Sequence, residues 1–175
     1  MRTKPELRRR KGHESVAFPE AGDYTTRPGG PSDRPACLAI GAALPDYFSP
    51  VGLVRMAHDL EAHEVWVRER AGTIVGYVVV ERKVSPVLEI LWLAVVPDRH
   101  GQGHGAALIE ALADQAKRCG IALLEVKTLA ATAEWPPYVR TRRFYERRGF
   151  MLLDVIDPYP GWRPGNPCAL YVRIV

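Results

Sequence analysis

The sequence predicts a single α/β (α+β) domain in which helices cover a mixed sheet. From residue 36 onward, short apolar runs of strand length alternate with segments in which apolar residues recur every three or four positions. The chain has 175 residues, and 47% of them are apolar, which is enough for one sizeable core. We expect about seven strands and about four helices.

The first 35 residues differ in composition from the rest. They hold only seven apolar residues, with eight basic and five acidic ones (8 − 5 = +3), which leaves 16 − 15 = +1 for residues 36 to 175. Such a segment buries too little surface to offset its ordering entropy. We therefore expect residues 1–35 to be a disordered basic tail and residues 36–175 to be the folded domain. The basic run at residues 8 to 11 fits a solvated tail better than a nucleic-acid site.

The first half of the folded part begins with an apolar run at residues 37 to 43, which is expected to be the first strand. Ser49 followed by Pro50 predicts a helix start, since serine caps helices and proline suits their first position. Residues 64 to 70 and 73 to 83 alternate in polarity and are joined by two turn residues, so they predict a hairpin.

The second half alternates between strands and helices more clearly. A continuous apolar run over residues 87 to 96 ends at a proline, and an amphipathic pattern over residues 103 to 119 predicts a helix. A strand at residues 121 to 129 then precedes an arginine-rich helix at about residues 138 to 148. The last two strands are expected at residues 150 to 156 and 169 to 175.

Several classes of protein are disfavoured. The net charge of +4 is too weak to argue for nucleic acid, and the longest apolar stretch, residues 90 to 96, is too short to cross a bilayer. No apolar leader segment follows the N-terminus, so a cytoplasmic protein is expected. The three cysteines and the histidines at 58 and 63 match no disulfide framework or metal-ligand spacing, and no metal is expected.

Glycines alternate at positions 101, 103 and 105, between an apolar strand and an amphipathic helix. Backbone amides can converge on a phosphate at such a place, and the first acidic residue of the helix, Glu110, comes late enough to leave the positive end of the helix dipole free. The spacing is neither a Walker A loop nor a dinucleotide fingerprint.

Two segments resemble a known family. Residues 93 to 105 read LAVVPDRHGQGHG and are similar to motif A of the GNAT superfamily of acetyl-CoA-dependent N-acetyltransferases, and residues 144 to 150, FYERRGF, are similar to its motif B. The resemblance covers roughly residues 36 to 175. The residues at 138 to 145 and 162 to 168 also resemble a group of uncharacterised bacterial members.

The resemblance implies a sheet splayed between strands four and five, with coenzyme A in the opening. It implies that backbone groups at Val95 and Val96 pair with the pantetheine arm and that the loop wraps the pyrophosphate. His100 stands where the superfamily most often has Gln or Arg, and the usual Asn after strand five is missing. The residues implied to bind the cofactor are Leu93, Ala94, Val95, Val96, His100, Gly101, Gln102, Gly103, His104, Gly105 and Phe144.

Glu89 is a carboxylate in the middle of an apolar strand, on the face expected to hold Leu91, Leu93 and Val95. Desolvation there favours a general base, and the superfamily often places its base on this strand. An ion pair with Lys83 or an arginine is an equally weighted alternative.

Tyr145 matches the residue that in many members of the superfamily protonates the leaving thiolate of coenzyme A. The alternative is packing beneath Phe150. The arginines at 140, 142, 143, 147 and 148 form a basic helix, one or two of which are expected to meet adenosine phosphates or an acidic acceptor. Four aromatic residues on predicted loops are candidates for an acceptor pocket: Trp135, Tyr138, Tyr159 and Trp162.

Two functions follow from the resemblance. The first is transfer of an acetyl group from acetyl-CoA to a primary amine, of a small molecule or a peptide, by direct attack. The alternative is a non-catalytic module that senses coenzyme A or acyl-CoA. Homodimers are common in the superfamily and are expected here as one option.

Overall fold

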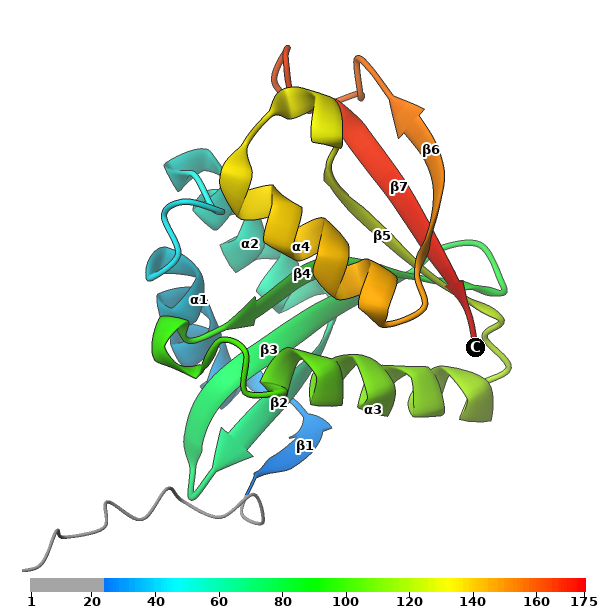
Figure 1. Ribbon diagram of the computed structural model, residues 1–175. Helices are drawn as coiled ribbons and strands as arrows, with labels where there is room; N and C mark the ends of the chain where they lie inside the picture. The colour runs from blue at the N-terminus through cyan, green and yellow to red at the C-terminus, as the bar shows by residue number, and fades with distance from the viewer. Residues whose placement is uncertain (1–23) are drawn as a thin grey trace, which may run out of the picture.

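The computed structural model describes residues 24–175, which form one seven-stranded sheet in the order β1-β2-β3-β4-β5-β7-β6 (Figure 1). Neighbouring strands are antiparallel except β4 and β5, which are parallel. The mixed sheet predicted from the sequence is therefore confirmed, and most of its pairs are antiparallel. The strands are β1 (Thr25–Pro28), β2 (Glu64–Arg70), β3 (Thr73–Arg82), β4 (Val87–Val95), β5 (Leu123–Leu129), β6 (Met151–Ile156) and β7 (Cys168–Ile174).

Helices cover both faces of this sheet. In Figure 1, α3 and α4 lie in front of the sheet, and α1 and α2 lie behind it. Two apolar cores result, one centred on Met56, Leu60 and Tyr77, the other on Ile90 and the apolar stripe of α3. No helix within residues 24–175 is long and apolar enough to cross a membrane. The α-helices are α1 (Arg34–Ala42), α2 (Pro50–Ala62), α3 (His104–Arg118) and α4 (Pro136–Arg147), and the short 3-10 helices are η1 (Pro31–Asp33), η2 (Pro97–Arg99) and η3 (Ala131–Ala133).

The helix cap and the hairpin turn predicted from the sequence are both present. The Ser49 hydroxyl accepts a hydrogen bond from the Gly52 N–H at 3.2 Å and so caps α2, with Pro50 at the first helical position. Ala71 and Gly72 both have positive φ, +47° and +76°, which gives the tight hairpin between β2 and β3.

Two expectations for the N-terminal part are wrong. Residues 37 to 42 belong to helix α1, and Ala43 is its C-cap. Cys37, Ile40 and Leu44 follow the helical spacing and are buried together, whereas a strand would alternate them between faces. The true first strand, β1, lies within the segment assigned to the tail. It is held by main-chain pairing with β2 and by Arg27, which pairs with Asp33 and Glu69 at 2.7 Å each, so it needs little apolar burial.

The predicted tail is thus shorter than residues 1–35, since residues 24 to 35 take part in the fold. The basic run at residues 8 to 11 lies outside the described residues.

The sheet forks between β4 and β5. These strands pair only from Val87 to Ile90 on one side and from Leu123 to Val126 on the other. Beyond Ile90, β4 continues to Val95 beside β3, and β5 continues to Leu129 beside β7, with no pairing between the two. The predicted splay between strands four and five is confirmed.

A β-bulge in β4 lies just past the fork. Val80 pairs with Ile90 and Val79 with Trp92, so Leu91 is an extra residue. One extra residue reverses which face the following side chains point to. Simple alternation predicted that Glu89 and Leu93 share a face of the sheet. Because of the bulge, they lie on opposite faces. Leu93 packs against the α3 core, and the face of Glu89 is that of α1 and α2.

Candidate active site

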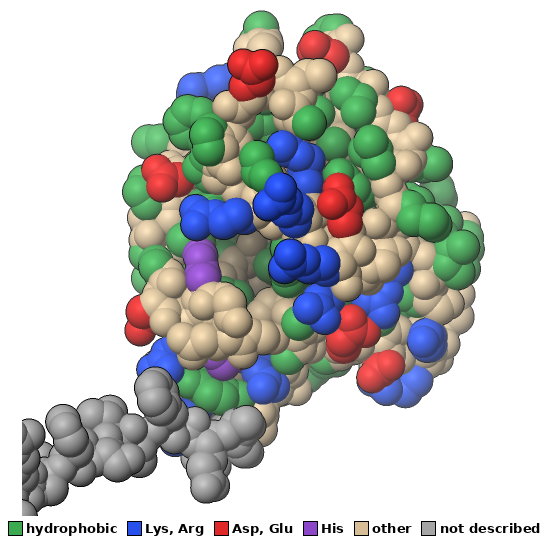
Figure 2. Space-filling model, in the orientation of Figure 1, with side chains coloured by type: hydrophobic (Ala, Val, Ile, Leu, Met, Phe, Trp, Pro, Cys, Tyr) green, Lys and Arg blue, Asp and Glu red, His purple; other side chains and the backbone are tan. Residues whose placement is uncertain are grey.

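The fork opens into a cleft of about 1300 Å³. Its walls are β4, β5, the loop at residues 99 to 105, α4, the segment 44 to 49 between α1 and α2, and the segment 159 to 166 between β6 and β7. Figure 2 shows this face hollowed, with Lys and Arg side chains gathered around the hollow. Glu89 and Tyr145 both line the cleft.

Strand β4 forms one wall of the cleft and holds some of the residues expected to bind the cofactor. Leu93, Ala94 and Val95, which the resemblance implies to bind the cofactor, line the cleft. Val96 does not, because it lies beyond the end of β4 and its N–H donates to the Val75 carbonyl at 2.9 Å. Main-chain pairing by Val96 through its N–H is therefore already committed to β3.

The glycine loop forms an open cradle at the start of α3. Gly103 has φ of +88°, and a Cβ there would meet no atom within 4 Å, so conformation rather than space explains the glycine. The first turn of α3 carries no acidic residue, which leaves the positive end of its dipole free. Gln102 points away, and its amide donates to the Asp98 carbonyl at 2.9 Å.

The two histidines of the loop have structural partners. His100 Nε2 lies 2.7 Å from the Val95 carbonyl oxygen, to which it donates, so this ring ties the loop to β4. The His104 ring is 5% exposed and packs edge-on against Tyr24, with ring centroids 4.4 Å apart. Its side chain therefore faces the β1 side of α3.

Close packing between α3 and α4 shapes the side of the cleft. A Cβ on Gly105 would lie 3.3 Å from the Phe144 ring, so glycine is what lets α4 approach this closely. Phe144 lines the cleft and stacks edge-on with Tyr145, with ring centroids 5.2 Å apart. The two motifs noted in the sequence thus meet at one point.

Glu89 stands in the middle of a row of three glutamates. The strand register places it opposite Glu81 of β3 and Glu125 of β5. Lys83 bridges Glu81 and Glu89 at 3.0 and 3.1 Å, and Lys127 bridges Glu89 and Glu125 at 2.7 and 2.6 Å. The ion pair with Lys83 that the sequence allowed is present, and the 6% exposed Glu89 carboxylate also faces the cleft.

Lys127 was not among the site residues expected from the sequence. Burial alone lowers the pKa of Lys127, but its hydrogen bonds to Glu125 and Glu89 outweigh burial and raise the pKa above the usual value, so the ammonium stays charged. Lys127 is the first residue of β5 past the fork, and it lines the cleft. Lys127 comes two residues after Glu125 on the predicted strand, so the sequence alone indicates that the two side chains share a face and can pair.

Tyr145 fits both interpretations drawn from the sequence. Its ring packs edge-on with Phe150, with centroids 5.3 Å apart, and its side chain also lines the cleft. Burial, and to a lesser degree Tyr138, raise the pKa of Tyr145 above its usual value, so the phenol is protonated at neutral pH.

Three arginines of α4, spaced three or four residues apart along one helix face, line the cleft together with Arg148 at the C-cap: Arg140, Arg143 and Arg147. Within residues 24–175, no ion pair holds Arg140, Arg143 or Arg147. Arg142 points elsewhere, because its guanidinium donates to the Leu129 carbonyl at 2.8 Å. Three guanidinium groups are therefore free to meet an anion.

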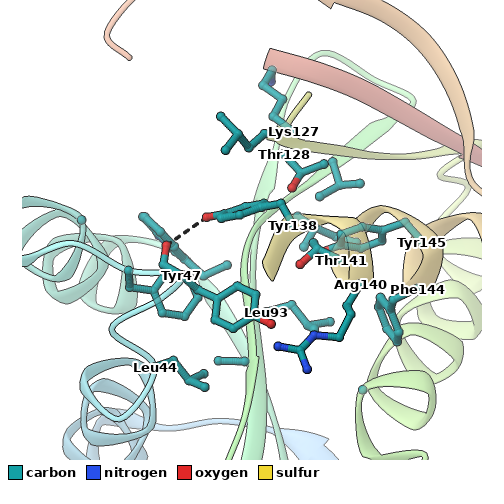
Figure 3. Close-up of a pocket in the computed structure, with 18 of the residues that line it drawn as sticks. Leu44, Tyr47, Leu93, Lys127, Thr128, Tyr138, Arg140, Thr141, Phe144 and Tyr145 are labelled. Atoms are coloured by element: carbon teal, nitrogen blue, oxygen red, sulfur yellow. Dashed lines mark hydrogen bonds between the residues drawn. The ribbon is translucent and has the colours of Figure 1, made fainter. Parts of the chain in front are cut away.

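An aromatic bridge crosses the cleft (Figure 3). The Tyr138 hydroxyl donates to the Tyr47 carbonyl at 2.9 Å, and the Trp135 indole donates to the Asp46 carbonyl at 3.0 Å. These bonds join α4 to the connection between α1 and α2, which lies about 90 residues earlier in the chain. The sequence pointed to Trp135 and Tyr138 but not to their partners, since segment 44 to 49 carries only turn signals.

The other two predicted aromatic residues also line the cleft. The Tyr159 and Trp162 rings lie edge-on with centroids 5.3 Å apart, and the Lys127 ammonium is 6.0 Å from the Tyr159 ring centroid. Among residues 24–175, no group of three or more His, Cys, Asp or Glu side chains is placed to hold a metal ion.

Comparison with known proteins identifies relatives of this fold. The chain is 29% identical over 125 residues to the mycothiol acetyltransferase of Propionibacterium freudenreichii subsp. shermanii. The aligned region covers 70% of this chain and 34% of that protein. The chain thus spans about a third of the length of this relative.

Two solved structures share the fold. A GNAT-family structure from Desulfovibrio desulfuricans superposes with a TM-score of 0.76 at 21% identity, over 86% of this chain and 98% of that one. A GNAT-family acetyltransferase from Elizabethkingia anophelis with acetyl-CoA bound superposes with a TM-score of 0.63 at 19% identity, over 88% and 99%.

A family model described as the acetyltransferase (GNAT) domain matches residues 61–152, more than half of the chain, and this span holds the fork, the glycine loop and Tyr145. The protein therefore belongs to the GNAT family of acetyltransferases.

Proposed function

We propose that the protein is an acetyl-CoA-dependent N-acetyltransferase that moves the acetyl group to a primary amine, of a small molecule or a peptide, by direct attack. The observation that supports this most is the cleft at the fork. In a GNAT-family sheet, the glycine loop, Glu89 and Tyr145 all line one continuous opening.

The residues present fit acetyl-CoA. The loop at residues 100 to 105 offers main-chain amides at an unopposed helix N-terminus for the pyrophosphate. The unpaired side of β4 over Leu93, Ala94 and Val95 suits a pantetheine arm, beside Phe144. The free arginines of α4 supply counter-charge for phosphates.

The proposed chemistry has two proton transfers, one from the acceptor amine and one to the leaving thiolate. The acceptor amine loses a proton to Glu89, directly or through water, and its nitrogen bonds to the thioester carbonyl carbon as the carbon–sulfur bond breaks. Tyr145 gives its proton to the departing thiolate. A main-chain N–H near Val95 stabilises the charge on the carbonyl oxygen. Holding both substrates together supplies much of the rate.

One observation favours the alternative, a non-catalytic module that binds coenzyme A or acyl-CoA. Two ammonium groups already pair with the Glu89 carboxylate, Lys127 at 2.7 Å and Lys83 at 3.1 Å. A purely structural Glu89 would have the same partners.

Thiol release from acetyl-CoA against a panel of polyamines, amino acids, aminoglycosides and peptide N-termini tests the proposal. We expect turnover with one class of amine, reduced about 100-fold or more in Glu89→Gln and about 100-fold in Tyr145→Phe. Matched controls are Glu125→Gln, which loses a carboxylate on the same lysine, and Tyr171→Phe, which removes a buried hydroxyl. Neither control residue lines the cleft.

The outcomes separate the two functions. Both control variants should retain most of the activity. Tight binding of coenzyme A by calorimetry, without turnover across the panel, would instead support the binding module. Equal losses in Glu89→Gln and Glu125→Gln would show that the glutamate row is needed for the fold rather than for proton transfer.

A further inference from the structure

The cleft is lined by more positive than negative side chains. Lysines and arginines outnumber acidic residues there by eight to three, and Figure 2 shows basic side chains around the hollow. Two of the acidic residues are already engaged, since Glu89 pairs with two lysines and the Asp59 carboxylate accepts a hydrogen bond from the Trp92 indole at 2.8 Å. The third, Asp46, is exposed. An acceptor with several positive charges, such as a polyamine or an aminoglycoside, therefore meets an excess of like charge.

Arg55 of α2 lies on the side of the cleft that Glu89 faces. Trp92 is opposite Val79, two residues from the β3 partner of Glu89, so Trp92 and Glu89 point to the same face of the sheet. The Trp92 indole donates to Asp59 of α2, and Arg55 comes one helical turn earlier on the same side of that helix. Arg55 is exposed and lines the cleft. Helix α2 thus brings a guanidinium to the side of the cleft on which Glu89 lies.

Arg163 belongs to the connection between β6 and β7, which contacts Glu89 through Lys127. The Lys127 ammonium lies 2.7 Å from the Glu89 carboxylate and 6.0 Å from the centroid of the Tyr159 ring. The Trp162 ring packs edge-on against Tyr159, with centroids 5.3 Å apart. Arg163 follows Trp162, is exposed and lines the cleft. A second guanidinium therefore reaches the cleft from the wall that carries Lys127.

These two arginines are available for a ligand. Among residues 24–175, no acidic side chain pairs with Arg55 or Arg163. Neither belongs to the elements proposed to hold acetyl-CoA, which are β4, the glycine loop and α4. A guanidinium donates paired hydrogen bonds to the oxygens of a carboxylate or a phosphate. Arg55 and Arg163 therefore suit an anionic group on the second substrate.

We propose that the acceptor is a primary amine that also carries a carboxylate or a phosphate group, which Arg55 and Arg163 bind while the amine reaches Glu89. This inference rests on the proposed N-acetyltransferase function and names the class of acceptor. The two arginines determine specificity through binding, and they take no part in the proton transfers.

Thiol release from acetyl-CoA with matched pairs of amines tests this proposal. The members of each pair differ in the anionic group: glycine and glycinamide, β-alanine and β-alaninamide, and phosphoethanolamine and ethanolamine. In the pair that reacts best, we expect the anionic amine to have a kcat/KM at least about tenfold higher than the neutral one, because hydrogen bonds between charged groups contribute about that much. The pair that responds distinguishes a carboxylate from a phosphate.

The double variant Arg55→Gln/Arg163→Gln should raise the KM of the anionic amine at least about tenfold, with kcat nearly unchanged and the neutral amine unaffected. Its affinity for coenzyme A, measured by calorimetry, should equal that of wild type, which also shows that the variant folds. Arg118→Gln is the matched control, because it removes an arginine that does not line the cleft, and it should change none of these values.

Equal kcat/KM values for the anionic and neutral amines would overturn the inference, and so would an equal loss for both in the double variant. Weaker binding of coenzyme A by the double variant would assign these arginines to the donor phosphates instead. If no amine reacts, the proposed function fails, but titration of the same pairs into protein saturated with coenzyme A still decides the inference. Preferential binding of the anionic amine supports it, and equal or absent binding overturns it.

Discussion

Burial changes the pKa of a single side chain and so its charge, and His104 in the glycine loop is an example. Burial first, and then the nearby Arg68 and Arg99, lower the pKa of His104 below its usual value of 6.5. Its ring packs on Tyr24, which joins the first turn of α3 to the start of β1. The neutral imidazole is therefore the form compatible with the fold, and protonation opposes folding.

This predicts a pH dependence of stability that His104 causes. A lowered pKa in the folded state means that the stabilising contribution is present above pH 6.5 and is lost as the pH falls below it. The slope for one proton is at most about 1.4 kcal/mol per pH unit. Urea unfolding at pH 7, 6 and 5 should show a smaller loss in His104→Leu than in wild type. The same slope in both proteins would rule out this role, and His58→Leu, at an exposed histidine, is the control.

At the scale of elements, the junction of β4 with α3 positions the loop on which the proposed function depends. Gly103 has a positive φ of +88° and precedes α3, and Gly120 has a positive φ of +69° and follows it. A Cβ at either position would meet no atom within 4 Å. Alanine therefore strains the two ends of the helix in the same way, but only Gly103 lines the cleft.

We expect Gly103→Ala and Gly120→Ala each to lower the free energy of unfolding by about 1 kcal/mol, from the left-handed backbone conformation. Gly103→Ala should in addition weaken coenzyme A binding about tenfold, because losing one main-chain hydrogen bond to a charged phosphate costs about that much. Calorimetric titration with coenzyme A needs no acceptor and measures this directly. Equal affinities for the two variants would place the phosphates away from the loop.

For the whole molecule, charge is distributed unevenly even though the formal net charge is only +4. Arginines of α4 that lack acidic partners among the described residues line the cleft, and so does Glu89, the middle glutamate of the lysine-bridged row. An acyl donor that carries phosphates should therefore bind with its charged end toward α4 and its thioester toward Glu89.

The binding of coenzyme A should accordingly weaken with salt. Between 0.05 and 0.5 M NaCl we expect its dissociation constant to rise several-fold, because screening shortens the range of charge interactions to a few ångströms. The double variant Arg143→Gln/Arg147→Gln should bind about tenfold more weakly at low salt and show a flatter salt dependence. Arg118→Gln, which removes a guanidinium bound to Gln115 at the far end of α3, should match wild type. An unchanged salt dependence in the double variant would remove these arginines from the phosphate site.

The sequence predicted elements well where local signals act. The Ser49 cap, the Ala71-Gly72 hairpin and the end of β4 before Pro97 are decided by neighbouring residues, and each is found in the structure. The prediction failed over residues 37 to 43, where a short apolar run suits either a strand or a buried helix. It also failed at β1, whose four residues are held by pairing with a strand about 40 residues later.

By itself, the sequence determined the fold class, the glycine loop and the family, because apolar periodicity and compact motifs are local properties. The fork between β4 and β5 was implied by the resemblance to that family. Only the tertiary structure decided which residues each side chain contacts. The β4 bulge set the face of Glu89, the strand register brought it between Lys83 and Lys127, and the Tyr138 hydrogen bond closed α4 onto Tyr47. These depend on contacts between segments far apart in the chain, and no local pattern encodes such pairings.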